Sequence, residues 1–319
     1  MRNVPTVIFS LLLILSLPLA LRRGGPAGRQ FRFFVFNTLC EIQVWDDDPL
    51  KVGGVVSAAM SELQELHDKL NIFAADSELS QLNRSVPGEY FACSKSLWQC
   101  LLAAQEAYEL SEGAFDVTVA PLMRLWSFGK EHAERLPSAD ELQACLAAVG
   151  FDKVSLDHKS RSVALTMPGM ALDMGGLAKG YALDRIKSRM EGAGLNCYML
   201  NFGGNIYCSE KPPPGKKYFS IGIRSPEKSA ELAQTLHLRD RFVSTSANYE
   251  RGISLGEKKI GHLLDPKSGY PVATEGSVTV ICSKGIYSDI FSTAVFVGGR
   301  ELADKLSRAV ENTEFVWLP

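Results

Sequence analysis

Apolar residues recur every three or four positions along residues 52–70, which predicts an amphipathic helix. The same spacing returns further along the chain. One of these later segments begins with Ser138 and Glu141 at the positions of a capping box, and Gly150 ends it. Helices are therefore predicted at about residues 52–70, 96–110, 138–150, 177–190, 288–297 and 301–310.

Strand patterns occupy other parts of the chain. Residues 31–45 are strand-like, and apolar and polar residues alternate from Cys40 to Val44. Two apolar runs, residues 154–156 and 163–165, flank a polar turn and predict a hairpin. Strands and helices are mixed without a regular βαβ rhythm, which favours an α+β fold over a doubly wound sheet. Further strands are expected at residues 171–173, 198–201, 218–223, 235–238, 242–245, 277–282 and 315–317.

The first residues differ from the rest. Residues 4–21 contain no charged residue and follow Arg2, which is typical of an export signal. A spanning helix needs about 20 apolar residues, so an uncleaved membrane anchor is the alternative. We expect residues 1–23 to be a signal peptide or anchor, residues 24–30 a flexible tether, and residues 31–319 the folded domain. That domain is then expected outside the cytoplasm, on the periplasmic side of the inner membrane, soluble or anchored by the N-terminal segment.

Composition narrows the class of protein. Apolar residues make up 46% of the chain, charged residues 22%, and the formal net charge is -2. These globular proportions exclude a disordered chain, and the absence of a basic excess argues against a nucleic-acid partner. The seven cysteines form no CxxC pair, which disfavours a zinc ribbon, and most lie in apolar runs. We expect them to be buried hydrophobic side chains, while one or two disulfides stay open in an exported chain.

The segment with the clearest chemical character is residues 171–182, ALDMGGLAKGYA. A short apolar strand ends at Asp173, passes two glycines and enters a helix. Glycines allow the backbone close to a ligand, and a helix start offers unpaired N–H groups. An anion such as a phosphate suits this place, and Lys179 could help to neutralise it. A tight strand–helix turn without a ligand is the alternative.

Three other segments carry candidate chemistry. Asp289 and Thr293 are four residues apart, and a carboxylate and a hydroxyl on one helix face suit a hard cation such as Mg²⁺. The alternative is that Asp289 only caps a helix. His262 could be a base or a ligand, although a lone histidine is more often structural, and residues 265–269 have the composition of a turn. The aromatic-rich residues 113–129 could line a planar ligand or belong to the core.

In their order along the chain and in their residues, these segments resemble those of the ApbE family, the FAD:protein FMN transferases. The resemblance covers about residues 36–298. Phe36-Asn37-Thr38 stands where many members have Met-Gly-Thr, and the lipoprotein cysteine common among exported members is missing. The segments that carry the resemblance are residues 77–83, 113–126, 173–181, 244–251 and 262–271, together with the Asp289/Thr293 pair.

The resemblance implies roles for individual residues. Asp289 and Thr293 match magnesium ligands, while Gly176 and Ser292 match positions that contribute backbone oxygens. Lys179 would balance phosphate charge, and His262 and Asp265 are the candidate bases for an acceptor hydroxyl. The positions that match flavin or FAD contacts are Phe36, Phe73, Ala114, Phe115, Asp116, Asp173, Lys179 and Leu263.

The implied reaction is Mg²⁺-dependent transfer of FMN from FAD to a Ser or Thr hydroxyl of an acceptor protein, with release of AMP. Two alternatives remain open: an FAD pyrophosphatase with water as acceptor, and a flavin-binding protein without turnover. The Asp289/Thr293 pair argues against the last, since a binder has less need of a metal. No convincing acceptor motif lies in this chain, so the expected partner is another protein, a redox subunit in the same compartment.

Overall fold

The computed structural model describes residues 28–128, 135–226, 231–248, 252–255 and 258–319. The expected signal or anchor and the first part of the tether lie outside these residues. Strand β1 (Arg29–Val35) begins inside the expected tether, so Arg29 and Gln30 belong to the sheet. Among the helices of the described residues, none combines the length and apolar character that a membrane span requires.

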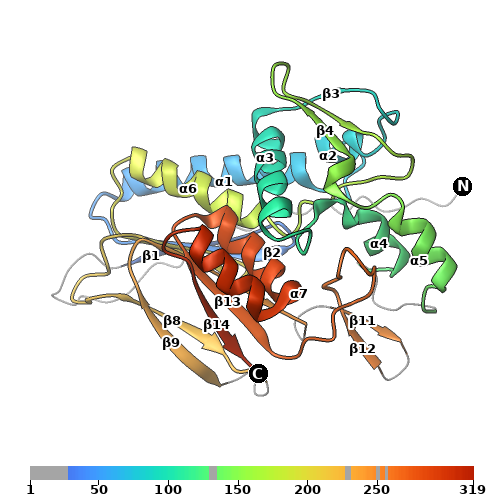
Figure 1. The fold of residues 1–319 in the computed structure, drawn as a ribbon. Coiled ribbons are helices and arrows are strands. Elements are labelled where there is room, and N and C mark those ends of the chain that lie inside the picture. The colour runs from blue at the N-terminus through green and yellow to red at the C-terminus, as the bar shows by residue number, and fades with distance from the viewer. Residues whose placement is uncertain (1–27, 129–134, 227–230, 249–251, 256–257) are drawn as a thin grey trace, which may run out of the picture.

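The centre of the fold is a seven-stranded sheet in which every pair of neighbouring strands is antiparallel (Figure 1). Its strand 277–282 has the bounds expected from the sequence. Helices pack on an antiparallel sheet, so the predicted α+β class is confirmed. In spatial order the strands are β1, β2 (Thr38–Val44), β6 (Tyr198–Phe202), β7 (Asn205–Cys208), β10 (Arg241–Ala247), β13 (Ser277–Cys282) and β14 (Glu314–Leu318).

Smaller sheets flank this centre. The predicted hairpin at residues 154–165 is present as β4 (Val154–Asp157) and β5 (Ser162–Leu165), and β3 (Phe91–Ala92) joins it. The hairpin of β8 (Phe219–Arg224) and β9 (Leu232–Leu238) covers part of one face of the large sheet through a separate apolar cluster. A last pair consists of β11 (Gly252–Leu255) and β12 (Lys258–Gly261).

Helices cover the opposite face. Helix α7 packs on β10 and β13, and α6 packs against both α7 and α1 (Figure 1). Helix α5 begins with the predicted capping box of Ser138 and Glu141. The two helices expected at 288–297 and 301–310 form one element, α7, with a break at Gly299, whose φ is 79°. The α-helices are α1 (Pro49–Leu70), α2 (Glu78–Leu82), α3 (Lys95–Leu110), α4 (Ala120–Leu125), α5 (Ala139–Leu146), α6 (Ala178–Gly192) and α7 (Gly285–Ala309); short 3₁₀ turns span Val117–Val119 and Phe151–Lys153.

Two strand predictions need correction. Residues 31–45 are a hairpin and not one strand, because Phe36 and Asn37 turn the chain with φ of 53° and 54°. Residues 171–173 form no strand. The backbone of Leu172 bonds instead to the side chain of Asn83: its N–H donates to Oδ1 at 2.7 Å, and its carbonyl accepts from Nδ2 at 2.9 Å. A side-chain amide therefore satisfies the groups that a neighbouring strand would otherwise pair.

The cysteines are packed as small apolar residues. All seven are free thiols, and five of them are buried. Burial raises the pKa of the Cys40 thiol to about 12, so it stays protonated and unreactive at neutral pH. The expectation of buried hydrophobic side chains is confirmed for these five.

Helices α6 and α7 cross at two glycines. A Cβ placed on Gly180 would lie 2.3 Å from the carbonyl oxygen of Gly285, and one on Gly285 would lie 2.5 Å from the carbonyl oxygen of Gly180. Both distances are far below van der Waals contact. Only residues without a side chain let the two backbones approach this closely.

We predict that Gly180→Ala lowers the free energy of unfolding by about 1–3 kcal/mol, because the new methyl group overpacks against backbone. Gly54 in α1 is the matched control, since no atom lies within 4 Å of a Cβ there. Gly54→Ala should raise the free energy of unfolding by about 0.5–1 kcal/mol. Urea denaturation of both variants and the parent measures the two effects, and equal signs would contradict the close crossing.

Candidate active site

The start of α6 receives its cap from another helix. Its own N-cap residue, Leu177, offers no side-chain acceptor. Asp289 of α7 takes this place, because its Oδ2 accepts a hydrogen bond from the backbone N–H of Gly180 at 2.9 Å. Asp289 lies one turn inside α7 and is only 5% exposed. It is therefore a cap as the sequence allowed, but for α6 and not for its own helix.

The start of α7 is capped in the same way from the other side. Its N-cap residue, Lys284, makes no side-chain cap. The carboxylate of Asp184 in α6 accepts from the N–H of Gly285 at 2.7 Å and from the N–H of Ile286 at 2.8 Å. Burial raises the pKa of Asp184, and these two N–H groups oppose the rise. The two helices thus cap each other at their crossing.

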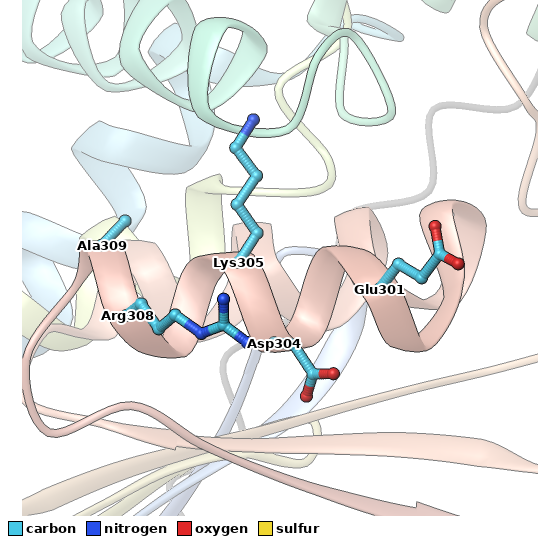
Figure 2. Close-up of a pocket in the computed structure, with 5 residues that line it drawn as sticks. All are labelled: Glu301, Asp304, Lys305, Arg308 and Ala309. Carbon is cyan, nitrogen blue, oxygen red and sulfur yellow. The ribbon is translucent and has the colours of Figure 1, made fainter.

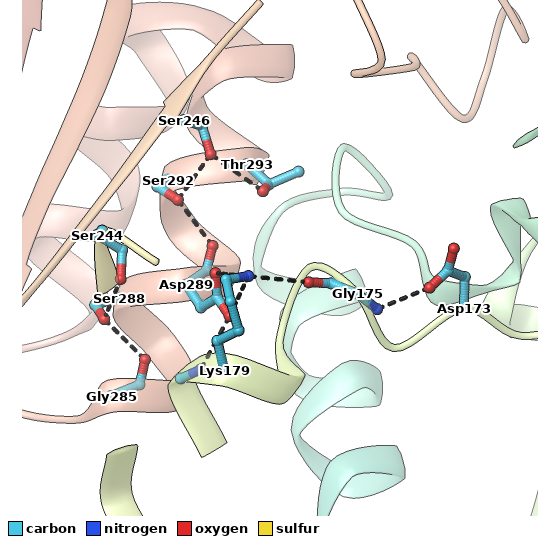
Figure 3. A network of polar contacts seen from close by, with 12 residues as sticks. Asp173, Gly175, Lys179, Ser244, Ser246, Gly285, Ser288, Asp289, Ser292 and Thr293 are labelled. Atoms are coloured by element: carbon cyan, nitrogen blue, oxygen red, sulfur yellow. Dashed lines mark hydrogen bonds and ion pairs between the residues drawn. The ribbon is translucent and has the colours of Figure 1, made fainter. Parts of the chain in front are cut away.

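Lys179 brings a positive charge to the same point. It lies in the first turn of α6, as predicted, and its Nζ is 3.4 Å and 3.5 Å from the two carboxylate oxygens of Asp289. The ammonium also donates to the carbonyl of Gly175 at 3.3 Å, across the glycine turn (Figure 3). Lys179 and Asp289 form a mostly buried ion pair that links the turn, α6 and α7.

A ladder of hydroxyl groups fixes α7 to β10 (Figure 3). Ser244 and Ser246 are two residues apart on β10, so they share one face of the strand, and both face the helix. Ser244 is 2.8 Å from the hydroxyl of Ser288, and Ser246 is 2.9 Å from that of Ser292 and 3.3 Å from that of Thr293. Sequence reasoning assigned no role to Ser244, Ser246 or Ser288. The available signal was the two-residue spacing on a strand and the four-residue spacing on a helix.

The oxygens around Asp289 fit a magnesium site in which the protein supplies some of the ligands and the substrate supplies others. Thr293 presents a hydroxyl, and Gly176 lies beside it, since a Cβ there would be 4.0 Å from Thr293 Oγ1 and 2.9 Å from Phe115 Cε2. Within the ranges that the structure describes, no group of three or more His, Cys, Asp or Glu residues could hold a metal. Mg²⁺ typically takes one or two carboxylates and completes its shell with water and substrate phosphates. Asp289, which is paired with Lys179, supplies one carboxylate, and Thr293 supplies a neutral oxygen, which matches that pattern.

Asp173 shapes the glycine turn. Its Oδ1 accepts from the N–H of Gly175 at 2.8 Å, in the turn that leads into α6 (Figure 3). Burial raises the pKa of Asp173, while this N–H and the charges of Lys179 and Arg124 lower it. The bonds of Asn83 to the preceding residue, described above, hold the other end of the turn.

The predicted flavin loop is buried. Ala114 and Phe115 are in the core, and Phe115 backs onto Gly176. Asp116 uses its carboxylate within the loop: Oδ1 accepts from the N–H and the hydroxyl of Thr118 at 2.8 and 2.7 Å, and Oδ2 accepts from the N–H of Phe151 at 3.2 Å. The described contacts of this side chain hold the loop in shape.

The segment after β12 lies against that loop. The indole N–H of Trp126 donates to the carbonyl of Gly269 at 2.8 Å, which joins the two segments. Leu263, next to His262, is buried. Asp265 closes the turn expected at residues 265–269, because its Oδ1 accepts from the N–H of Lys267 at 3.0 Å. The family segment at 244–251 continues into residues 249–251, which lie outside the described residues.

The two remaining aromatic candidates differ in exposure. Phe36 is partly buried and meets the ring of His67 edge-on, with centroids 5.6 Å apart. Phe73 is 73% exposed, just after the end of α1. An exposed aromatic ring of this kind can cover one face of a planar ligand.

A separate hollow on α7 is not part of this constellation. Figure 2 shows its lining residues on the half of α7 that follows the break at Gly299. None of them contributes to the cluster around Asp289, and Lys305 is paired with Glu112 of another segment. The lining residues are Glu301, Asp304, Lys305, Arg308 and Ala309.

Comparison with known proteins places the chain in a family. Residues 36–317 match the model of the ApbE family, so the chain belongs to it, and the resemblance seen in the sequence is confirmed. The chain is 30% identical over 266 residues to the FAD:protein FMN transferase of Klebsiella pneumoniae, covering 83% of this chain and 82% of the relative. It is 31% identical over 259 residues to that of Haemophilus influenzae, covering 78% and 75%. The crystal structure of the ApbE protein from Thermotoga maritima matches with a TM-score of 0.81 and 28% identity, over 91% of this chain and 94% of that one.

We predict that Asp116→Asn lowers the free energy of unfolding by about 1–3 kcal/mol, because an amide NH₂ in place of one oxygen would face a backbone N–H and leave it unpaired. Asp157→Asn is the control. Asp157 makes similar local bonds, to Lys159 and Ser160, in an exposed hairpin turn. Thermal unfolding should show a clear drop for Asp116→Asn alone. Equal drops in both variants would mean that the buried carboxylate has no special part in the loop.

Proposed function

We propose that this protein is a flavin transferase that moves FMN from FAD to a Ser or Thr hydroxyl of an acceptor protein, with Mg²⁺ and with release of AMP. Its family and the names of its relatives support the transfer of FMN. The observation that carries the finer proposal is the cluster around Asp289. It combines one buried carboxylate, neutral oxygens, a lysine and a helix start.

The start of α6 is suited to bind the pyrophosphate of FAD. A helix N-terminus carries a partial positive charge, and Lys179 adds a full one in the first turn. The glycine turn before it lets the backbone approach the phosphates closely. The exposed ring of Phe73 offers apolar surface for the flavin part of the substrate, whereas Phe115 and Leu263 are buried.

Asp289 and Thr293 would hold the magnesium ion, with backbone oxygens of Gly176 and Ser292 beside them. When Mg²⁺ is bound, it withdraws charge from the phosphates and so stabilises a negatively charged transition state. Such transfer depends mainly on positioning and electrostatics. The geometry around α6 and α7 therefore matters more than any single reactive side chain.

In the proposed reaction the acceptor hydroxyl attacks the phosphorus on the FMN side of FAD. A phosphoester bond to the acceptor forms, the bond to the AMP phosphate breaks, and AMP leaves. The hydroxyl proton goes to a base of this chain. His262 and Asp265 are the candidate bases.

We propose further that the protein acts outside the cytoplasm on a redox subunit in the same compartment, attached to the membrane if its N-terminal segment is retained. The uncharged residues 4–21 and the preceding Arg2 support export.

The decisive test is mass spectrometry of a purified acceptor protein incubated with the enzyme, FAD and Mg²⁺. We predict an FMN-sized mass increase of the acceptor with the parent enzyme. With Asp289→Asn the rate should fall by about 100-fold or more, because the variant keeps an oxygen for Gly180 but loses the charge that would bind the metal. The melting temperature without metal should also fall, because Lys179 loses its ion-pair partner, so circular dichroism checks that the variant is folded. The same reaction followed by chromatography without an acceptor separates the hydrolase alternative. FMN and AMP released at an equal rate in both cases would favour hydrolysis, and FAD that stays intact throughout would indicate a binding protein.

We predict that Lys179→Met weakens FAD binding, because the phosphates lose their cation. It should also lower the melting temperature, because the buried Asp289 loses its ion-pair partner. Lys187→Met is the matched control: Lys187 lies on the same helix, pairs with Asp240 at 2.9 Å, and its side chain is 21% exposed against 18% for Lys179. Titration of flavin fluorescence should show weaker binding for Lys179→Met only. Equal FAD affinity in the two variants would leave Lys179 a structural residue.

A further inference from the structure

The crossing of α6 and α7 is built from one pattern used twice. Helix α6 carries Gly180 and, four residues later, Asp184; helix α7 carries Gly285 and, four residues later, Asp289. Residues four apart share a helix face, so in each helix the glycine and the aspartate both face the crossing. Each aspartate accepts from the N–H of the glycine on the other helix.

The two halves of this pattern differ in their surroundings. Asp289 also meets Lys179, and Thr293, one turn further along α7, lies beside Gly176 in the proposed magnesium site. Asp184 has no place in that cluster. Its two oxygens are directed at the first N–H groups of α7, at 2.7 and 2.8 Å.

The position of the Asp289 carboxylate depends on how the first turn of α7 is held. Asp289 lies only four residues beyond Gly285, and the N-cap of α7 offers no side-chain acceptor of its own. Gly285 and Ile286 are buried, so without Asp184 their N–H groups would lack both a side-chain partner and water. The first turn would then shift or fray to reach a new partner, and the carboxylate one turn later would move with it.

We propose that Asp184 is a positioning residue for the metal site: it fixes the start of α7 on α6 and thereby sets the distance of Asp289 from Lys179, Gly180 and Gly176. This inference rests on the proposed magnesium-dependent function. Partners that orient a metal ligand typically contribute about 10- to 100-fold to metal affinity.

The chain offers a matched control in Asp48, the cap of α1. Its Oδ1 accepts from the N–H of Leu50 and of Lys51, both at 3.0 Å, so it also satisfies two N–H groups at a helix start. Asp184→Asn takes the acceptor from one of the two N–H groups at the start of α7, because each oxygen of Asp184 serves a different N–H. Asp48→Ala is the control, because both N–H groups use the same oxygen of Asp48 and an asparagine would keep it. Of the two helices, only α7 carries a proposed metal ligand.

The experiment measures the Mg²⁺ concentration that half-saturates FAD binding, followed by flavin fluorescence, in the full-length parent and both variants. Asp184→Asn should raise this concentration about tenfold or more, while Asp48→Ala leaves it unchanged. Melting temperatures, which should fall in both variants, show that each cap has been lost. Equal Mg²⁺ dependence in the two variants would overturn the inference. If FAD binding by the parent protein itself shows no Mg²⁺ dependence, the proposed function fails and not the role of Asp184.

Hydrogen exchange gives a readout that needs no metal. Loss of a merely local cap would speed exchange only at the N–H groups of Gly285 and Ile286. Because the caps are reciprocal, Asp184→Asn should also speed exchange of the peptide that contains Gly180, on the other helix. Exchange confined to the start of α7 would contradict the coupling, and it would do so even in a variant that remains folded.

Discussion

The site depends on one close approach between two backbones. Where α6 crosses α7, the glycines leave no room for side chains, and the first N–H groups of each helix come within reach of a carboxylate from the other. Helix starts are normally satisfied by residues of their own segment. Here that task is exchanged between helices, so packing and hydrogen bonding at the crossing cannot vary independently. The same contact that packs the helices also places Asp289 beside Lys179.

The charges at the crossing of α6 and α7 explain why the buried carboxylate of Asp289 is stable and which ligands the site would bind. The charge of Asp289 is balanced by the ammonium of Lys179, by the N–H of Gly180 and by the positive end of α6. Asp289 and Lys179 offset each other, and the positive end of α6 lies beside them. A divalent cation alone would add uncompensated positive charge here, whereas a cation together with a diphosphate would not. We therefore expect metal and substrate to bind together more tightly than either alone.

Local patterns allowed part of this arrangement to be predicted. We predicted that Asp289 and Thr293 share one helix face and that Lys179 lies in a first helical turn. Both predictions are correct, because they follow from helix periodicity and composition. The ion pair of Lys179 with Asp289 joins residues 110 positions apart, and no local pattern shows it. In the sequence, Asp184 looks like any acidic residue of a polar helix. Its role comes only from its bonds to the first N–H groups of α7, 101 and 102 positions away. The prediction of a strand at residues 171–173 was wrong because of another distant contact: the backbone of Leu172 bonds to the side chain of Asn83.

The same long separations determine when the site can form. Asn83 meets Leu172 across 89 positions, and Ser246 meets Thr293 across 47. Contacts of this range close large loops, and they become favourable only once most of the surrounding structure exists. An unfolded chain therefore offers a divalent cation no preassembled ligands, unlike a zinc finger, whose metal drives its folding. A cation at the proposed site would act on the finished fold and stabilise it by mass action. If the proposed function holds, loading of the metal would follow folding, in whichever compartment the chain completes it.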